Sequence, residues 1–367
     1  MWKQFSISVY AKGTPEDWER IENYLSLSKK YGCVDVFTSA HMPELSLQDQ
    51  LKVLSRLTGL VHKNKQKLTI DFGGHSLLYI LENKKECDFL RHCSVDAIRL
   101  DYGYDPKIMV KIFNKLNVSE FVWNASTMAE NEILDFWKVS SKYSNFKITG
   151  CHNFYPLKHS GLDEDFVIAQ NLKFHTLQIP VTLCVPCFTN PRGPLYEGLP
   201  TIESHRYFSF EKCLLESFKE NMADMLLIGD EFLSKADFDQ IFSIQNRNPL
   251  EIRIVELEGI SNVEKSILYE KPHQIRYDSN SIIFRSQTSR EMAEPGKLIE
   301  PGHIFDRHYA YITINNNNYG RYSGELQFVW SNLSADRRVN VVAKVCNKDV
   351  WKFNHARAGF SYRLVKL

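Results

Sequence analysis

The sequence has almost no net charge, because 45 Lys and Arg residues balance 44 Asp and Glu residues and the formal net charge at pH 7 is +1. A protein that binds nucleic acid or an anionic membrane through its overall field carries a clear excess of basic residues. The charge balance therefore predicts neither nucleic acid nor a membrane as a partner. The chain also lacks any apolar run of about 18 residues, which a membrane-spanning helix needs.

Cysteine is scarce as well, with eight in 367 residues, too few for a fold held together by disulfide bonds. Cys184 and Cys187 are spaced as in a zinc site, but no second Cys pair or His pair follows at a matching spacing. We expect reduced thiols and no metal ion. The first residues alternate polar and apolar side chains, without the basic start and continuous apolar segment of a signal peptide. These features predict a cytoplasmic protein.

Several catalytic motifs are missing. The chain contains no HExxH, P-loop, GxSxG or EF-hand pattern, and no glycine-rich dinucleotide turn follows the first expected strand. No lysine lies at the top of an expected strand, since Lys67 and Lys147 both stand at strand starts. This absence disfavours an aldolase-type Schiff base, and with it a barrel isomerase or lyase acting on a sugar phosphate. We expect no organic cofactor.

What the sequence does contain is a regular alternation of apolar, β-branched segments with amphipathic helical segments. The expected strands are 5–10, 33–40, 67–73, 97–103, 120–126, 146–152, 179–188 and 224–230. Eight such units are the number in a closed (β/α)₈ barrel. An open, doubly wound sheet is the alternative, and the missing dinucleotide turn disfavours it. The sequence therefore predicts an α/β protein with a (β/α)₈ TIM barrel over residues 1–246.

The pattern changes after Ile244, where residues 246–249 form a short polar linker that ends in proline. Beyond the linker, Asn, Gly and Pro clusters separate short segments that alternate polar and apolar residues. These expected strands are 252–257, 274–277, 281–285, 309–315, 324–330 and 339–345. Residues 250–367 are therefore expected to form a second, smaller and mostly β domain, built as a barrel or a sandwich.

Polar side chains recur near the carboxyl ends of the expected barrel strands. Side-chain alternation places Arg99 and Asp101 on one face of their strand, and it places Asp71 and Asn124 on the same face of neighbouring strands. Barrel enzymes build their sites at this end of the strands. A purely structural ion pair between Arg99 and Asp101 is the alternative. The repetition over several strands favours a polar site at the barrel mouth.

The loop after the sixth expected strand brings His152, Asn153 and Tyr155 within a few residues. Together they supply hydrogen-bond donors, acceptors and an aromatic face. A single histidine is more often a packed, hydrogen-bonded residue than a catalyst. The cluster on one loop favours a binding site.

The loop after the seventh expected strand, residues 190–206, is long, and long loops without their own helix or strand tend to be functional. It carries Glu197, Glu203, His205 and Arg206. Two carboxyl groups are the minimum equipment for glycoside hydrolysis, because one protonates the leaving oxygen and the other acts as nucleophile or base. We expect Asp101 and either Glu197 or Glu203 to form the catalytic pair.

Five motifs follow one another along the chain: LDYG at 100–103, WNAS at 123–126, CHNFYP at 151–156, GLPTIESHR at 198–206 and YGRYSGELQ at 319–327. Each alone is weakly specific, but the ordered set is specific. Together they resemble the 6-phospho-N-acetylmuramidase (MupG) family over essentially the whole chain.

The resemblance implies a TIM barrel followed by a cyclophilin-like β domain, and a cytoplasmic hydrolase of bacterial cell-wall recycling. The implied substrate is a phosphorylated amino-sugar disaccharide, in which 6-phosphorylated N-acetylmuramic acid is joined to N-acetylglucosamine. The residues expected to bind it are Asp71, Arg99, Asn124, His152, Asn153, Tyr155, His205, Arg206 and Arg321. Among these, Arg206 and Arg321 are the expected phosphate ligands, because a guanidinium group can form paired bonds to phosphate.

Two alternatives stay open. The chain can be a non-hydrolytic phospho-sugar binding or regulatory protein on a barrel scaffold, because fold does not imply catalysis. It can also be a divergent glycosidase for another phospho-sugar. A homodimer is compatible with each of these interpretations. Retention or inversion of the anomeric configuration depends on the separation of the carboxyl groups, which sequence does not give.

Overall fold

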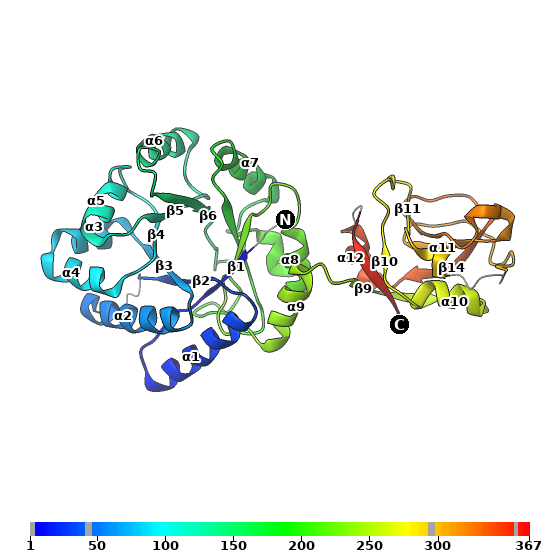
Figure 1. Cartoon of the computed structure of the whole chain (residues 1–367), viewed down its shortest axis with the longest axis horizontal. Coiled ribbons are helices and arrows are strands. Elements are labelled where there is room, and N and C mark those ends of the chain that lie inside the picture. Colours follow the sequence, from blue (N-terminus) through cyan, green and yellow to red (C-terminus); the bar gives the residue numbers. More distant parts are fainter. Residues whose placement is uncertain (1–3, 41–45, 293–297, 356–358) are drawn as a thin grey trace. The chain divides into compact units, whose positions relative to one another are not determined.

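The computed structural model describes residues 4–40, 46–292, 298–355 and 359–367. The chain divides into two compact units, Met1–Phe242 and Ser243–Leu367. Within the described residues of the first unit, eight parallel strands close into a barrel in chain order (Figure 1). The strands are β1 (Gln4–Ser8), β2 (Asp35–Ser39), β3 (Lys67–Phe72), β4 (Ala97–Leu100), β5 (Glu120–Asn124), β6 (Lys147–Cys151), β7 (Val181–Val185) and β8 (Met225–Ile228). The predicted eight-stranded barrel is confirmed.

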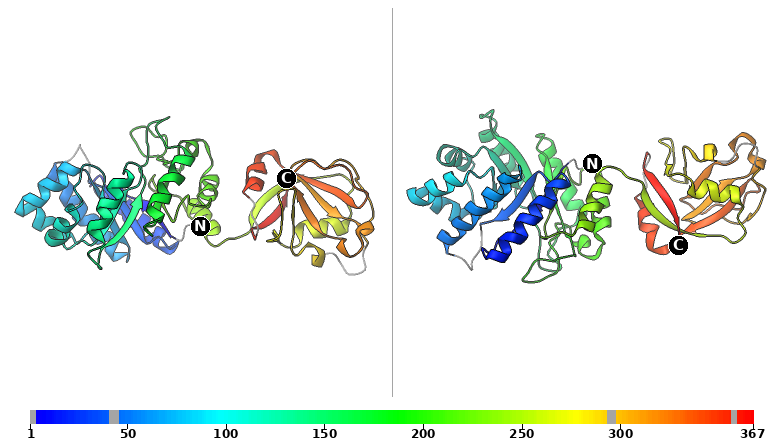
Figure 2. Two further views of the ribbon diagram at one scale, coloured as in Figure 1. Left: turned by 90° about the horizontal axis from the view of Figure 1, so that it is seen from above. Right: turned by 60° about the horizontal axis from the view of Figure 1, so that its bottom comes forward.

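Helices alternate with these strands and surround the barrel (Figures 1 and 2). They are α1 (Pro15–Lys30), α2 (Leu47–Lys63), α3 (Gly74–Glu82), α4 (Lys84–Cys93), α5 (Ile108–Leu116), α6 (Glu130–Ser140), α7 (Glu164–His175), the short 3₁₀ helix η1 (Glu203–Tyr207), α8 (Phe210–Glu216) and α9 (Lys235–Gln245). Local chemistry explains where α1 begins. The Thr14 hydroxyl accepts the Asp17 N–H, and Pro15 occupies the first turn, where its missing N–H costs nothing.

The two faces of the barrel strands pack differently. Outer-face side chains pack against the helices, as Phe5 does against Phe238, with ring centroids 6.3 Å apart. Inside the barrel, a separate cluster of buried residues, here called the floor cluster, consists of Tyr10, Phe37, Cys151, Cys184 and Leu227. These residues lie in or just after β1, β2, β6, β7 and β8, and their side chains pack together. Apart from Tyr10, the floor cluster lines the same cavity as the polar side chains described in the next subsection.

The second unit is mostly sheet, as expected. Its described residues contain a seven-stranded sheet in the order β10-β15-β9-β14-β12-β13-β11, antiparallel apart from the β15–β9 pair. The elements are β9 (Leu250–Glu256), α10 (Asn262–Tyr269), β10 (His273–Gln274), β11 (Ile283–Arg285), α11 (Ser289–Met292), β12 (Tyr311–Asn315), η2 (Asn317–Tyr322), β13 (Leu326–Val329), β14 (Val339–Val345), η3 (Asn347–Asp349), α12 (Val350–Asn354) and β15 (Ser361–Lys366). One apolar core, with Ile254, Ile312, Phe328 and Phe353 among its members, holds the sheet and helices together.

Two further observations bear on the sequence-based expectations. Among the helices of the described residues, none is long and apolar enough to cross a membrane. The eight cysteines are free thiols, and seven of them are buried.

Candidate active site

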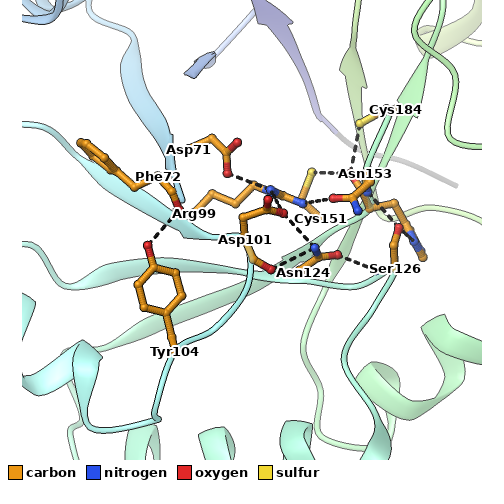
Figure 3. Close-up of polar contacts among 11 residues, drawn as sticks. Asp71, Phe72, Arg99, Asp101, Tyr104, Asn124, Ser126, Cys151, Asn153 and Cys184 are labelled. Carbon is orange, nitrogen blue, oxygen red and sulfur yellow. Dashed lines mark hydrogen bonds and ion pairs between the residues drawn. The ribbon is translucent and has the colours of Figure 1, made fainter. Parts of the chain in front are cut away.

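The guanidinium group of Arg99 is the centre of a polar cluster at the carboxyl end of the barrel strands (Figure 3). β4 directs this side chain inward, and the residue is only 4% exposed. Its Nη1 donates to Asp71 Oδ1 at 2.8 Å and to Asp101 Oδ1 at 2.9 Å, while its Nη2 donates to Asn153 Oδ1. Burial disfavours the charged form, but the two carboxylates outweigh it and raise the pKa of Arg99 above its ordinary value. Arg99 therefore stays charged and links β3, β4 and the end of β6.

Asp71 and Asp101 both accept the hydrogen bond from Arg99 through Oδ1. Asp101 Oδ1 also accepts a hydrogen bond from Asn124 Nδ2 at 2.9 Å, so Arg99 and Asn124 hold the same oxygen from two sides. Asp101 Oδ2 has no partner among the described residues, and the side chain is 28% exposed. Asp71 is less exposed, at 19%. Because both Oδ1 atoms bind one nitrogen, they are separated by at most two hydrogen-bond lengths.

A cavity of about 260 Å³ opens beside these groups. The residues that line it are Asp71, Arg99, Asp101, His152, Asn153 and Phe154, together with Phe37, Cys151, Cys184 and Leu227 of the floor cluster. A cavity of about 400 Å³ lies at the opposite, amino-terminal end of the strands, beside Lys67, Glu120 and Lys147. Barrel enzymes place their chemistry at the carboxyl end, so the smaller cavity is the candidate active site.

His152 lies at the edge of this cavity, but the protein itself uses both of its ring nitrogens. Nδ1 contacts Ser126 Oγ at 3.1 Å, and Nε2 contacts Asn171 Oδ1 at 2.8 Å. Burial lowers the pKa of His152 to about 4, which keeps the ring neutral at neutral pH. The thiols of Cys151 and Cys184 both donate to the His152 carbonyl oxygen, at 3.4 and 3.3 Å. This segment is therefore fixed by its backbone and by its side chain.

The loop residues Glu203 and Arg206 form a clamp, and they lie in η1 rather than in an open loop. The Glu203 carboxylate accepts bonds from Arg206 Nε and Nη2, at 2.9 and 3.1 Å, and from the backbone N–H groups of His159 and Gly161, at 3.0 and 2.9 Å. The Arg206 hydrogen bonds, followed by the two backbone N–H groups, outweigh desolvation and lower the pKa of Glu203 to about 2. The carboxylate is ionised and fully engaged.

All three guanidinium nitrogens of Arg206 are used within the same clamp. Besides Glu203, they donate to the carbonyl oxygens of Tyr155, Leu157, Glu197 and Gly198. The residue is 7% exposed. Arg206 therefore ties the loop after β6 to the loop after β7, and it has no free donor for a phosphate group.

Two other loop residues are also engaged away from the cavity. Glu197 forms an ion pair with Lys158 at 2.8 Å. His205 is 1% exposed and packs against Phe208, with ring centroids 6.0 Å apart. Burial lowers the pKa of His205 to about 4. Its buried ring is closed to a sugar.

The structure thus separates the sequence-predicted site into three groups. One group converges on or beside the cavity: Asp71, Arg99, Asp101, Asn124, His152 and Asn153. A second group is absent from the described residues that line the cavity: Glu197, Glu203, Tyr155, His205 and Arg206. Arg321 lies in the second unit, exposed, and its Nη2 donates to Tyr322 Oη at 2.7 Å.

Sequence reasoning missed residues that support the cavity from outside. Asn171 is fully buried in the middle of α7 and reaches His152 across the barrel wall. Its one sequence signal is an amide in a helix interior, where such side chains are unfavourable unless they are bonded elsewhere. Thr201 was also missed, and its hydroxyl donates to the Asn153 carbonyl oxygen at 2.8 Å. Among the described residues, no group of three or more His, Cys, Asp or Glu side chains could hold a metal ion.

Comparison with known proteins agrees with this architecture. The family model for the N-terminal part of 6-phospho-N-acetylmuramidase matches residues 5–243, and that for its C-terminal part matches residues 250–364. No curated protein matches the chain. A crystal structure of an uncharacterized B. cereus protein matches with 22% identity and a TM-score of 0.77, covering 100% of both chains. A crystal structure of a conserved Enterococcus faecalis protein with unknown function matches with 26% identity and a TM-score of 0.74, covering 99% of this chain and 96% of that one. The chain belongs to the 6-phospho-N-acetylmuramidase family.

Proposed function

We propose that this protein hydrolyses the glycosidic bond of a disaccharide that contains 6-phosphorylated N-acetylmuramic acid. Membership in the family supports the reaction class. The observation that carries the proposal is the arrangement of Asp71, Arg99 and Asp101 at the carboxyl end of a closed barrel, on the wall of a cavity. Two carboxyl groups beside a cavity are the equipment that glycoside hydrolysis requires.

Within this proposal Asp101 is the reacting carboxylate. Arg99 and Asn124 fix its Oδ1, which leaves Oδ2 free to act as nucleophile or base. Asp71 takes the place first expected of Glu197 or Glu203, because Asp71 lines the cavity with Asp101, whereas both glutamates are absent from the described residues that line it. The carboxyl groups of retaining enzymes are about 5–5.5 Å apart, against about 6.5–9.5 Å in inverting enzymes. The nitrogen shared by Asp71 and Asp101 favours the shorter separation and hence retention.

The phosphate contact falls to residues other than Arg206, whose donors are used within the clamp. Arg321 stays the proposed ligand, since its guanidinium lies over the Tyr322 ring, 4.8 Å from the ring centroid, with no carboxylate partner among the described residues. A cytoplasmic location, a role in cell-wall recycling and a cyclophilin-like second unit belong to the same proposal and rest on the resemblance.

The direct test is product analysis. The full chain is incubated with the 6-phosphorylated disaccharide of N-acetylmuramic acid and N-acetylglucosamine, and the products are identified by mass spectrometry. The proposal expects two monosaccharides, with the phosphate on the muramic acid. The unphosphorylated disaccharide, as control, should be cleaved far more slowly. Calorimetric binding of the phosphorylated disaccharide without cleavage would instead support the non-hydrolytic alternative.

A further inference from the structure

A buried chain of hydrogen bonds runs from α7, through the end of β6, to the segment after β5. Its members are Asn171, His152 and Ser126, which are 0%, 1% and 6% exposed. The chain ends at Asn153, whose side chain contacts Arg99. The direction of each hydrogen bond decides what this chain can do.

The direction is set at Asn171. Its Nδ2 donates to the carbonyl oxygens of Asn221 and Met222, at 2.8 and 2.9 Å. Carbonyl oxygens only accept hydrogen bonds, so this nitrogen is placed correctly and Oδ1 is the atom that faces His152 Nε2, at 2.8 Å. An amide oxygen also only accepts. His152 Nε2 must therefore carry a proton.

The other ring nitrogen follows from this. A neutral imidazole carries one N–H, so Nδ1 of His152 is the acceptor and the Ser126 hydroxyl donates to it at 3.1 Å. The same hydroxyl oxygen accepts the backbone N–H of Asn153 at 2.9 Å. Every polar side-chain atom of Asn171, His152 and Ser126 thus has a hydrogen-bond partner when His152 adopts this one tautomer. Burial, with a smaller contribution from the Arg99 charge, outweighs the Asn171 hydrogen bond and lowers the pKa of His152 to about 4, so the ring stays neutral.

The hydrogen-bond chain fixes the position of Asn153. Its N–H is held by Ser126 and its carbonyl oxygen by Thr201, at 2.9 and 2.8 Å. Its Oδ1 then accepts a hydrogen bond from Arg99 Nη2, whereas Nη1 donates to the two carboxylates. The orientation of the guanidinium, and with it the placement of Nη1 between the two carboxylates, therefore depends on a fixed Asn153.

We propose that Ser126, His152 and Asn171 are positioning residues that act through Asn153 and Arg99 on the two carboxylates. His152 is accordingly not a proton donor to the substrate, and its nitrogens are not sugar ligands. This inference rests on the proposed glycosidase function for its kinetic consequence, but the tautomer and the neutrality of His152 do not depend on any substrate.

The kinetic test is Ser126→Ala, with Ser28→Ala as a matched control. Ser28 is buried, at 0% exposed, and like Ser126 it makes two hydrogen bonds: its hydroxyl donates to the Leu25 carbonyl oxygen and accepts from Gln66 Nε2. Because small misplacements of reacting groups cost up to about 100-fold in rate, Ser126→Ala should lower kcat by about 10- to 100-fold. KM should stay near the wild-type value, and Ser126→Thr, which keeps the hydroxyl, should restore most of kcat. Ser28→Ala should leave kcat unchanged while lowering Tm by a similar few degrees.

The structural test is ¹⁵N NMR of the histidine side chains in the full chain without ligand. The His152 signal is assigned by its loss in His152→Gln. The inference expects a protonated Nε2, an unprotonated Nδ1 and no titration between pH 8 and pH 5. An Nδ1–H tautomer, or a ring that titrates near its ordinary pKa of about 6.5, would overturn it. So would a kcat in Ser126→Ala equal to that in Ser28→Ala. If the wild-type chain cleaves no disaccharide, the proposed function fails, while the NMR result still decides the hydrogen-bond chain.

Discussion

Replacing Glu203 by Gln removes the charge from a carboxylate that accepts four hydrogen bonds, two from Arg206 and two from backbone N–H groups. The amide keeps only one acceptor oxygen, and its NH₂ group then faces a donor. Arg206, whose side chain is 2% exposed, is left without a counter-charge. The pKa of Glu203 is lowered from 4.5 to about 2, which sets an upper limit of about 3 kcal/mol for the ionised form.

The side chain of Glu203 is 19% exposed, so solvent screening reduces this value, and we expect a loss of about 2–3 kcal/mol in the free energy of unfolding. For a unit of this size, about 2–4 °C is lost per kcal/mol, so Tm should fall by about 5–10 °C at pH 7. Because the folded pKa is depressed, the stabilisation is fully present above the unfolded pKa and is lost as pH falls towards about 2. The difference in Tm between wild type and Glu203→Gln should therefore narrow below about pH 4.5.

Thermal unfolding, monitored by circular dichroism between pH 3 and pH 8, measures the stability. Initial rates at temperatures well below Tm measure the activity. The clamp predicts a kcat for Glu203→Gln close to that of wild type. A kcat lowered by orders of magnitude with an unchanged Tm would contradict the structural role of Glu203 and return it to the catalytic pair.

Three further predictions follow from the same geometry. Arg99→Lys keeps the charge, but an ammonium group does not reproduce the planar guanidinium that reaches two carboxylates and Asn153. The kcat should therefore fall by at least about 10-fold, and an unchanged kcat would contradict a role of Arg99 in placing the carboxylates. Buried His205 has a pKa of about 4, so between about pH 6.5 and pH 4 it binds a proton in the unfolded chain but not in the folded chain. Its presence should therefore lower the free energy of unfolding by about 1.4 kcal/mol for each pH unit of acidification in this range. His205→Leu should make the acid dependence of unfolding by urea shallower by that amount and leave kcat intact. Arg321→Ala should raise KM for the phosphorylated disaccharide only; an equal loss on both disaccharides would exclude a phosphate contact.

The fold could be predicted because its signals are local. Apolar segments at regular spacing indicated the eight barrel strands, and side-chain alternation placed Asp71, Arg99 and Asp101 on the inner face, where the structure has them. β15 was missed. It pairs with β9, more than a hundred residues earlier in the chain, and no local pattern marks such a partner.

The loop glutamates show where sequence reasoning stops. Glu203 and Glu197 have the residue type and the approximate place that a catalytic carboxylate needs. Their engagement depends on contacts from a different loop, with Gly161 and His159 for Glu203 and Lys158 for Glu197. Such contacts arise from the approach of two loops in space and leave no mark in the spacing of either one.

Comparing Asp101→Asn with Asp105→Asn on the phosphorylated disaccharide shows whether Asp101 is the reacting carboxylate. Asp101 contacts Arg99 and Asn124 at the cavity. Asp105 is an exposed carboxylate nearby, and among the residues that the structure describes its side chain accepts the Lys107 N–H alone. We expect the kcat of Asp101→Asn to be lowered by about 10³-fold or more, because the reacting carboxylate is lost. The variant should stay folded, and Asp105→Asn should keep the wild-type kcat. Near-wild-type turnover by a folded Asp101→Asn protein would contradict it.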